Sequence, residues 1–249
     1  MKMIIPICIS ILISAITFAQ PSNLPLGNLI DIPIARYATP GQVETELRMY
    51  NNGGLLATIT IGIMDRFEFG VSYGGENIIG TGDANLNPRP ELHVRCLIKE
   101  EQFLFPAILA GFHSQGYGPY SKSQNRYALK SKGFYLVASK NTSFLGGIGI
   151  HGGVNKTLET DDGDSDINFF AGCHKHIGPS LTLLCDYDLA INDNDSKAQG
   201  SGEGYLNAGI RWNLAQKVFV DFAWKNLFEN VKQEVGTSRE VKISYITNL

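Results

Sequence analysis

The sequence predicts an all-β protein, a 12-stranded antiparallel transmembrane β-barrel of the bacterial outer membrane. Three observations carry this prediction. The chain opens with an export signal, its remainder alternates apolar and polar residues with a period of two, and short and long connections between the alternating segments follow one another. Each observation is typical of outer-membrane barrels, and together they favour that class over a soluble β-protein.

The N-terminus resembles a secretory signal peptide. Lys2 supplies a positive charge, residues 3–16 are almost wholly apolar, and Thr17-Phe18-Ala19 has the small-x-small pattern of a cleavage site. We therefore expect residues 1–19 to be a signal peptide and residues 20–40 to be a periplasmic N-terminal segment. The alternative is a membrane anchor, but the apolar run is short for a span and no charged stop follows it.

Twelve segments after residue 40 alternate as strands do when one face meets lipid and the other meets the lumen. In the first, Val43, Thr45, Leu47 and Met49 face one way, and Glu44, Glu46, Arg48 and Tyr50 face the other. The segments have the roughly 9–11-residue length that a tilted membrane strand needs. The expected strands of this barrel, residues 41–249, are 41–50, 54–64, 66–75, 90–99, 104–115, 131–140, 143–154, 166–175, 179–191, 202–213, 216–226 and 238–247.

The connections between these segments alternate in length. Short turns at Met64 to Arg66, Lys99 to Gln102, Asn141-Thr142, His176 to Gly178 and Leu214 to Gln216 alternate with the longer polar segments 76–89, 116–130, 155–165, 192–201 and 227–237. Outer-membrane barrels have short periplasmic turns and long outer loops, so both ends of the barrel chain are expected on the periplasmic side. A secreted soluble β-sandwich or lipocalin-like barrel is the rival, but it explains neither the strand length nor this alternation.

Composition excludes several other classes. The chain has 43% hydrophobic and 18% charged residues, which is too polar for a helical membrane protein. The net charge of −3 argues against a nucleic-acid partner, because that partner calls for a basic stripe. Cys96, Cys173 and Cys185 cannot all pair, although Cys173 and Cys185 are expected on adjacent strands facing lipid.

Charges of both signs fall on the lumen-facing phase of the strands. The candidate lumen-lining residues are Glu44, Glu46, Arg48, Glu68, Arg95, Asp186, Asp188, Arg211, Asp221 and Lys225, with Lys242 in the same phase. One interpretation is a plugged interior held by ion pairs, because charges inside a membrane protein must be paired or wetted. The other interpretation is a polar pore.

No motif predicts a cofactor, a metal ion or a catalytic residue. The G-x-G-x-x-G at Gly147 to Gly152 lies inside a strand-like segment and lacks the helix that a dinucleotide site needs. Asp162, Asp164 and Asp166 resemble a calcium loop, but Ile167 and Cys173 stand where an EF-hand has Gly and Glu. Weak divalent binding by this loop stays open. Four histidines (His93, His113, His151 and His174) are expected on the lumen face, with no pair at i, i+2 on one strand.

A family resemblance covers about residues 27–140. The stretch Gly27-Asn28-Leu29-Ile30-Asp31-Ile32-Pro33-Ile34-Ala35-Arg36 resembles the opening of the YjbH-like outer-membrane proteins, and Pro90-Glu91, Lys99 to Glu101, Pro106-Ala107, Gly111 and Tyr135 to Lys140 are similar to their middle region. The resemblance implies a β-barrel linked to exopolysaccharide export. Several members of that family are larger and are lipoproteins, and this chain has neither feature.

We therefore expect a non-enzymatic outer-membrane barrel that assists exopolysaccharide secretion or envelope organisation. The alternative is a passive, porin-like diffusion channel for small polar solutes; an outer-membrane enzyme and an adhesin acting through the long loops are weaker possibilities. Expected partners are outer-membrane lipids, lipopolysaccharide and the barrel-assembly machinery, with polysaccharide or export proteins implied by the resemblance. Pro33, Ala35 and Arg36 are expected to dock at or inside the barrel mouth, and we hypothesise that Arg36 pairs with Glu44 or Glu46.

Overall fold

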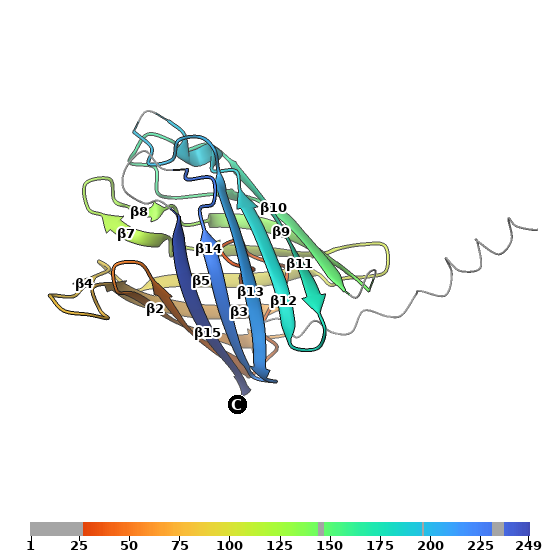
Figure 1. The fold of residues 1–249 in the computed structure, drawn as a ribbon. Helices are drawn as coiled ribbons and strands as arrows, with labels where there is room; N and C mark the ends of the chain where they lie inside the picture. Colours follow the sequence, from red (N-terminus) through yellow and green to blue (C-terminus); the bar gives the residue numbers. More distant parts are fainter. Residues whose placement is uncertain (1–26, 144–146, 196, 231–236) are drawn as a thin grey trace, which may run out of the picture.

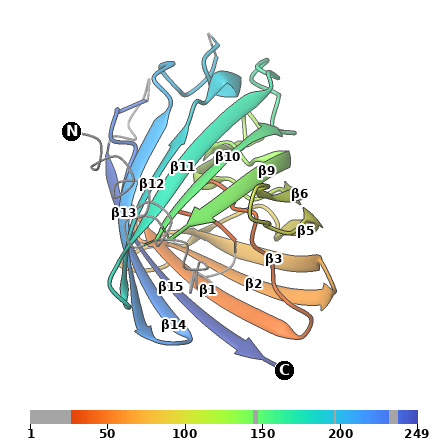
Figure 2. The same ribbon diagram turned by 90° about the vertical axis from the view of Figure 1, so that its right-hand side faces the viewer.

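Twelve strands form a closed antiparallel barrel in the computed structural model, which describes residues 27–143, 147–195, 197–230 and 237–249 (Figures 1 and 2). The barrel strands are β1 (Gln42–Tyr50), β2 (Gly54–Met64), β3 (Phe67–Glu76), β5 (Glu91–Lys99), β6 (Ala107–His113), β9 (Gly133–Thr142), β10 (Ile148–Lys156), β11 (Asn168–Ile177), β12 (Leu181–Asp188), β13 (Tyr205–Ala215), β14 (Val218–Lys225) and β15 (Ser238–Asn248). Each corresponds to one predicted segment. The predicted fold class is confirmed.

The barrel closes because the first strand pairs with both the second and the last. β1 lies between β2 and β15, and the remaining neighbours follow sequence order round to β2–β3. The register places Leu47 opposite Ala57 on one side and Ile243 on the other, so outward residues of adjacent strands meet. Closure leaves no barrel strand with an unpaired edge, which a lipid environment requires.

The outer wall carries an apolar belt, as the alternation predicts. Large hydrophobic side chains exposed on the strands include Ile59, Val71, Leu92, Val94, Phe134, Leu136, Ile150, Phe169, Leu183, Phe222 and Ile243. Trp212 and Trp224, 48% and 41% exposed, lie near opposite ends of the membrane-spanning region, where aromatic girdles form. Among the described residues, no helix is long and apolar enough to cross a membrane.

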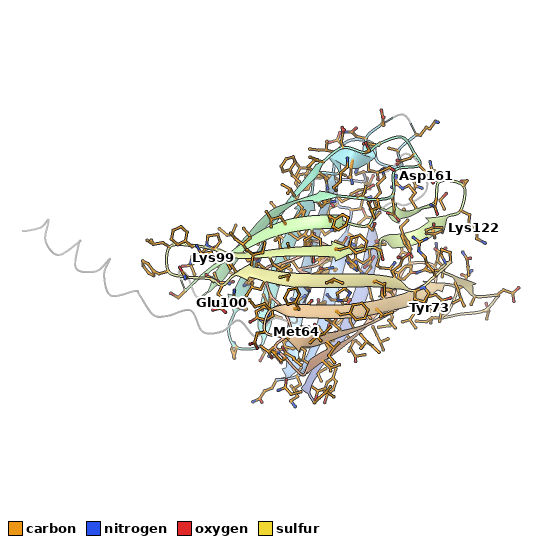
Figure 3. All side chains as sticks on the ribbon, turned by 180° about the vertical axis from the view of Figure 1, so that it is seen from behind. Met64, Tyr73, Lys99, Glu100, Lys122 and Asp161 are labelled. Carbon is orange, nitrogen blue, oxygen red and sulfur yellow. The ribbon has the colours of Figure 1, made fainter. Side chains whose placement is uncertain are left out.

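Short turns and long loops lie at opposite ends of the barrel. In Figure 3, Met64, Lys99 and Glu100 mark the end with short turns, and Tyr73, Lys122 and Asp161 lie towards the end with long loops. The backbone N–H of Leu249 donates to the carbonyl oxygen of Gly41 at 2.9 Å, so the C-terminus lies beside the start of β1 at the short-turn end. This is the predicted periplasmic end.

The first hairpin is the exception, with a tight turn at the long-loop end. Asn52 and Gly53 have φ of 58° and 60°, the left-handed values that both central residues of a type I′ turn need. Asn-Gly is the preferred pair for that turn, because it tolerates positive φ and matches the twist of the flanking strands. Local turn chemistry therefore explains why this outer connection is short.

The structure corrects several predicted boundaries. Asn141 and Thr142, predicted as a turn, are the last residues of β9, and β10 begins at Ile148 rather than at residue 143. Segment 179–191 ends as a strand at Asp188, followed by the short helix η2 (Ile191–Asp193). The long loops also contain β4 (Asn85–Leu86) and the hairpin of β7 (Tyr117–Ser121) and β8 (Arg126–Leu129). These small elements pair with nearby residues inside loops and are too short for an alternating pattern to predict them.

Candidate functional site in the barrel lumen

The lumen contains residues 27–38, here called the plug segment. The segment folds back on itself: the backbone N–H of Leu29 donates to the carbonyl oxygen of Ile32 at 2.9 Å, and that of Ile34 donates to Gly27 at 3.1 Å. Leu29 and Ile32 are completely buried. A short apolar segment cannot fold alone, so it gains its structure from the barrel wall around it.

An apolar cluster fixes one side of the plug segment. Four of its side chains pack with wall residues of β5, β6, β9, β11, β12 and β14; the cluster comprises Leu29, Ile30, Ile32 and Ile34 with Leu97, Ala107, Leu109, Tyr135, Val137, Phe170, Leu184 and Ala223. Burial of each large aliphatic side chain contributes about 1.5–3 kcal/mol. The lumen thus holds a small hydrophobic core inside an otherwise polar interior.

Wall carboxylates bind the backbone N–H groups of the plug segment. The Oδ2 atom of Asp186 accepts hydrogen bonds from Ile30, Asp31 and Ile32 at 3.1, 2.8 and 3.2 Å. Glu68 accepts the N–H of Ala38 at 2.6 Å. Successive N–H groups that converge on one anion form a strong local site, so Asp186 fixes the tip of the segment.

Wall arginines bind the carbonyl groups. Arg95 donates to the carbonyl oxygens of Gly27 and Arg36, each at 3.1 Å. Arg211 donates to that of Leu29 at 2.8 Å. Glu68 balances the charge of Arg95 at 2.5 Å, and Asp221 balances Arg211 at 2.7 Å. The backbone of the segment is therefore satisfied from both sides, as burial demands.

Asp31 brings an acidic side chain to the middle of this interior. It pairs with Arg48 at 2.6 Å and with Lys225, and Arg48 also pairs with Glu240 at 2.5 Å. Asn207 donates to both Asp31 and Asp186, at 3.2 and 2.8 Å. Buried charges are tolerated when paired and hydrogen-bonded in this way, and removal of one partner is then costly.

The structure places the candidate lumen residues as follows. Those buried inside the barrel are Glu44, Arg48, Glu68, Arg95, Asp186, Arg211, Asp221, Lys225 and Lys242. Glu46 is partly exposed and lies 3.3 Å from Lys242, and Asp188 pairs with Lys132 near the outer end. Among the family-motif residues, the N–H of Ala35 donates to Ser139 at 2.8 Å, Pro33 bridges back to Asn28, and Arg36 has an attractive electrostatic interaction with Glu44.

The outer loops contact the plug segment through Tyr117. The guanidinium of Arg48 lies 3.9 Å from the centre of the Tyr117 ring, and the Tyr117 hydroxyl accepts a hydrogen bond from Asn28 at 2.8 Å. Tyr117 belongs to β7, a short strand within the segment 116–130 that the sequence predicts as a loop. Aromatic stacking on a cation adds to the ion pairs that hold the tip of the plug segment.

Acidic residues of the outer loops bind cationic side chains of the same chain. Arg126, fully buried, pairs with Asp162 at 2.5 Å and with Asp193 at 2.7 Å, and Lys130 also pairs with Asp162. Although burial raises the pKa of Asp162, the Lys130 hydrogen bond and charge lower it below its ordinary value. Among the described residues, no three acidic, His or Cys side chains are placed to hold a metal ion. This network of side chains ties the β7–β8 hairpin to two further loops.

The histidines correct one prediction. β11 runs to Ile177, so His174 and His176 share one strand at i, i+2, whereas the sequence analysis placed His176 in a turn and found no such pair. His151 hydrogen-bonds Ser139 at 2.7 Å and His174 at 2.9 Å. The alternation of side chains through His174 and His176 indicates that the strand continues, although the sequence predicts a turn at His176 to Gly178.

A polar cavity remains between the plug segment and the wall. The centres of water molecules can occupy about 40 Å³ of it. Its lining comprises Gly27, Asn28, Glu44, Glu46, Leu56, Thr58, Thr60, His93, Arg95, His113, Gln115, Tyr117 and Tyr135. The plug segment therefore occupies the lumen incompletely.

Comparison with known proteins supports the fold. The sequence matches no protein-family model and no curated protein. A solved structure described as KdgM porin matches with a TM-score of 0.52 at 9% identity, over 82% of this chain and 98% of that chain. The chain has the fold of a bacterial outer-membrane β-barrel. The predicted outer-membrane location is confirmed at the level of this fold, and its environment is membrane lipid.

Two other structures align over similar lengths with lower scores. They are outer membrane phospholipase A from Escherichia coli (TM-score 0.36, 8% identity, 86% of this chain and 98% of that chain) and the outer membrane channel DcaP of Acinetobacter baumannii (TM-score 0.31, 9% identity, 83% and 96%). The KdgM porin match, with a TM-score above 0.5, is the one that supports the fold. Membership of the YjbH-like family stays a prediction, since no family model matches.

Proposed function

We propose that this protein is a porin-like, non-enzymatic outer-membrane channel for small polar solutes, narrowed by its own plug segment. The observation that carries the proposal is the polar cavity beside the plug segment, lined by carboxylate, hydroxyl, imidazole and amide groups. Such a lining suits water and polar solutes rather than a closed apolar core. The barrel with the similar fold is itself described as a porin.

The plug segment sets the width of the channel in this proposal. It is held by ion pairs and hydrogen bonds that the wall makes with its backbone and with Asp31. A barrel of this strand number is narrower than the large porins, so even a short segment takes up much of the lumen. We expect the intact protein to conduct weakly.

The experiment is conductance in a planar bilayer, comparing the mature chain with a variant that lacks residues 20–38. The folded state of each is checked first by heat-modifiable gel migration. The intact protein should give small ohmic steps, and the deletion variant should give steps several times larger. A deletion variant that is folded but does not conduct would rule out the channel.

The second candidate is assistance to exopolysaccharide secretion or envelope organisation, with polysaccharide or export proteins as partners. The observation in its favour is that the residues of the family resemblance, Gly27 to Arg36, are the residues that form the plug segment. The test is the amount of polysaccharide released by cells that lack the protein, with the intact chain restored as the control. Unchanged release in the deletion strain would argue against this role.

A further inference from the structure

The plug segment fills the lumen asymmetrically. Its apolar cluster draws wall residues from β5, β6, β9, β11, β12 and β14, and no described residue of β1 or β2 belongs to it. The polar cavity lies on that other side, where β1 supplies Glu44 and Glu46 and β2 supplies Thr58 and Thr60. This cavity therefore borders the β1–β2 wall, and it also reaches Arg95 of β5 and Tyr135 of β9.

A second cavity extends this space towards the outer loops. Its lining includes Arg48, Tyr50, Asn87, Gly118 and Glu240, and it shares Leu56, Gln115 and Tyr117 with the first cavity. Three shared residues make the two cavities neighbours along one wall. We call this row of cavities the side path.

The inner part of the side path contains the carboxyl groups of Glu44 and Glu46. The Oε1 atom of Glu44 is buried and has no hydrogen-bond partner among the described residues, and Glu46 is 20% exposed beside it. Four cations lie near. Arg95 is matched by Glu68 and Arg211 by Asp221, Lys242 is shared between Glu46 and Asp221, and Arg36 of the plug segment interacts electrostatically with Glu44. A buried hydrogen-bond acceptor without a partner costs free energy, so this site favours a solute that is positively charged or carries a hydrogen-bond donor.

We infer that the side path is a cation-selective route past the plug segment, with Glu44 and Glu46 as the residues that select small monovalent cations and cationic solutes over anions. This inference rests on the proposed channel function. The physical basis is that carboxylates in a narrow, low-dielectric passage focus a negative potential and raise the local concentration of cations. The solvent-exposed acids of the outer loops lie outside this passage, where salt screens them.

The test is the reversal potential of the mature chain in a KCl gradient across a planar bilayer. The intact protein should favour K⁺ over Cl⁻ several-fold, and Glu44→Gln with Glu46→Gln should bring the permeability ratio close to one. The matched control is Asp161→Asn with Glu203→Gln, which removes two carboxylates from exposed loop positions and should leave the ratio unchanged. Glu46→Gln alone, at a partly exposed position, should lower the ratio in part and serves if the double variant does not fold.

The outcomes separate the two proposals. A conducting Glu46→Gln or double variant with the selectivity of the intact protein would overturn the role of Glu44 and Glu46 and leave the channel standing. An equal loss of selectivity in the loop control would also overturn it, because a general surface potential would then be the cause. Absence of current from the folded intact chain and from the folded variant without residues 20–38 would overturn the channel itself.

Discussion

At the scale of single residues, the barrel interior is held together by charged side chains that each pair with more than one partner. Asp31 from the plug segment meets Arg48 of β1 and Lys225 of β14, two strands separated by β15 in the barrel. Each of these charges is buried. One side chain of the plug segment therefore connects two non-adjacent strands of the wall, and its removal affects several partners at once.

Replacement of Asp31 by Asn should lower the free energy of unfolding by about 3 kcal/mol, the low end for breaking a buried ion pair, because Arg48 keeps Glu240. The measurement is the urea midpoint of unfolding in lipid vesicles, followed by heat-modifiable gel migration. Asp161→Asn, at an exposed loop position, is the control and should leave the midpoint unchanged. Equal midpoints for the Asp31 variant and the intact protein would contradict the assignment.

Glu159, in the outer loops, makes their packing dependent on pH. It accepts the backbone N–H groups of Tyr127 and Ser131, and burial raises its pKa to about 7 from its ordinary value of 4.5. Because the pKa is raised in the folded state, its stabilising contribution is present below pH 4.5 and is lost as the pH rises through about 7. The β7–β8 hairpin should therefore open more often at about pH 8 than at about pH 5.

Hydrogen exchange of the Tyr127 and Ser131 amides measures this opening. After correction for intrinsic exchange, protection should fall between the two pH values in the intact protein. Glu159→Gln, which cannot ionise, should remove the fall. Protection that is the same at both pH values in the intact protein would show that Glu159 does not titrate there.

The residue scale also shows what the sequence could predict. The inward phase of the charged residues follows from a period of two, because alternate side chains of a strand face opposite sides. Their partners do not follow from it: Asp186 binds a backbone more than 150 positions away, and no pattern in either segment indicates that contact. The requirement for glycine at position 149 also depends on a contact that the sequence does not indicate. A Cβ there would lie 2.0 Å from the His174 ring on the adjacent strand.

At the scale of elements, the strands were predictable and the elements within loops were not. Strand segments carry long alternation, whereas β7 and β8 are short and depend on Arg126 contacts with two other loops. The plug segment is also too short for a period to be informative. Its docking was expected from apolar character alone, and its contacts required the closed wall around it.

The tight first hairpin provides a prediction at this scale. A Cβ at Gly53 would lie 2.0 Å from the carbonyl oxygen of Ile79, and φ there is +60°. Gly41 also has positive φ, +77°, but a Cβ there would meet nothing within 4 Å. Gly41→Ala should therefore cost about 1 kcal/mol for the left-handed backbone alone, and Gly53→Ala should cost clearly more.

Urea midpoints of the two glycine variants in the same vesicles give the comparison. The difference between them isolates the collision with the β3–β5 loop, because both variants share the backbone penalty. If Gly53→Ala costs no more than Gly41→Ala, the loop does not pack on the turn as the structure has it. The need for positive φ in the turn would then be sufficient to explain the glycine at this position.

At the scale of the whole molecule, apolar residues serve two unrelated purposes. Ile59 of β2 faces the lipid and is 57% exposed, whereas Ile32 of the plug segment is completely buried in the lumen. A soluble protein would place both in one core. Here the barrel wall separates a lipid-facing belt from a small internal cluster, to which the inner face of six strands contributes apolar residues.

This separation predicts that replacing Ile by Asp has different effects on the lipid face and in the lumen. Ile59→Asp puts a charge on the lipid face, which costs less than the about 2–4 kcal/mol of an Arg or Lys at mid-membrane depth but is still unfavourable, so the yield of heat-modifiable barrel in vesicles should fall. Ile32→Asp should leave insertion intact, because Ile32 lies inside the lumen and does not face lipid. A charge in the apolar cluster should loosen the plug segment and increase the conductance. Because the membrane-facing wall is complete without the plug segment, insertion depends on the wall and conductance on the contents of the lumen. Equal loss of insertion in both variants would show instead that wall and plug segment form a single folding unit.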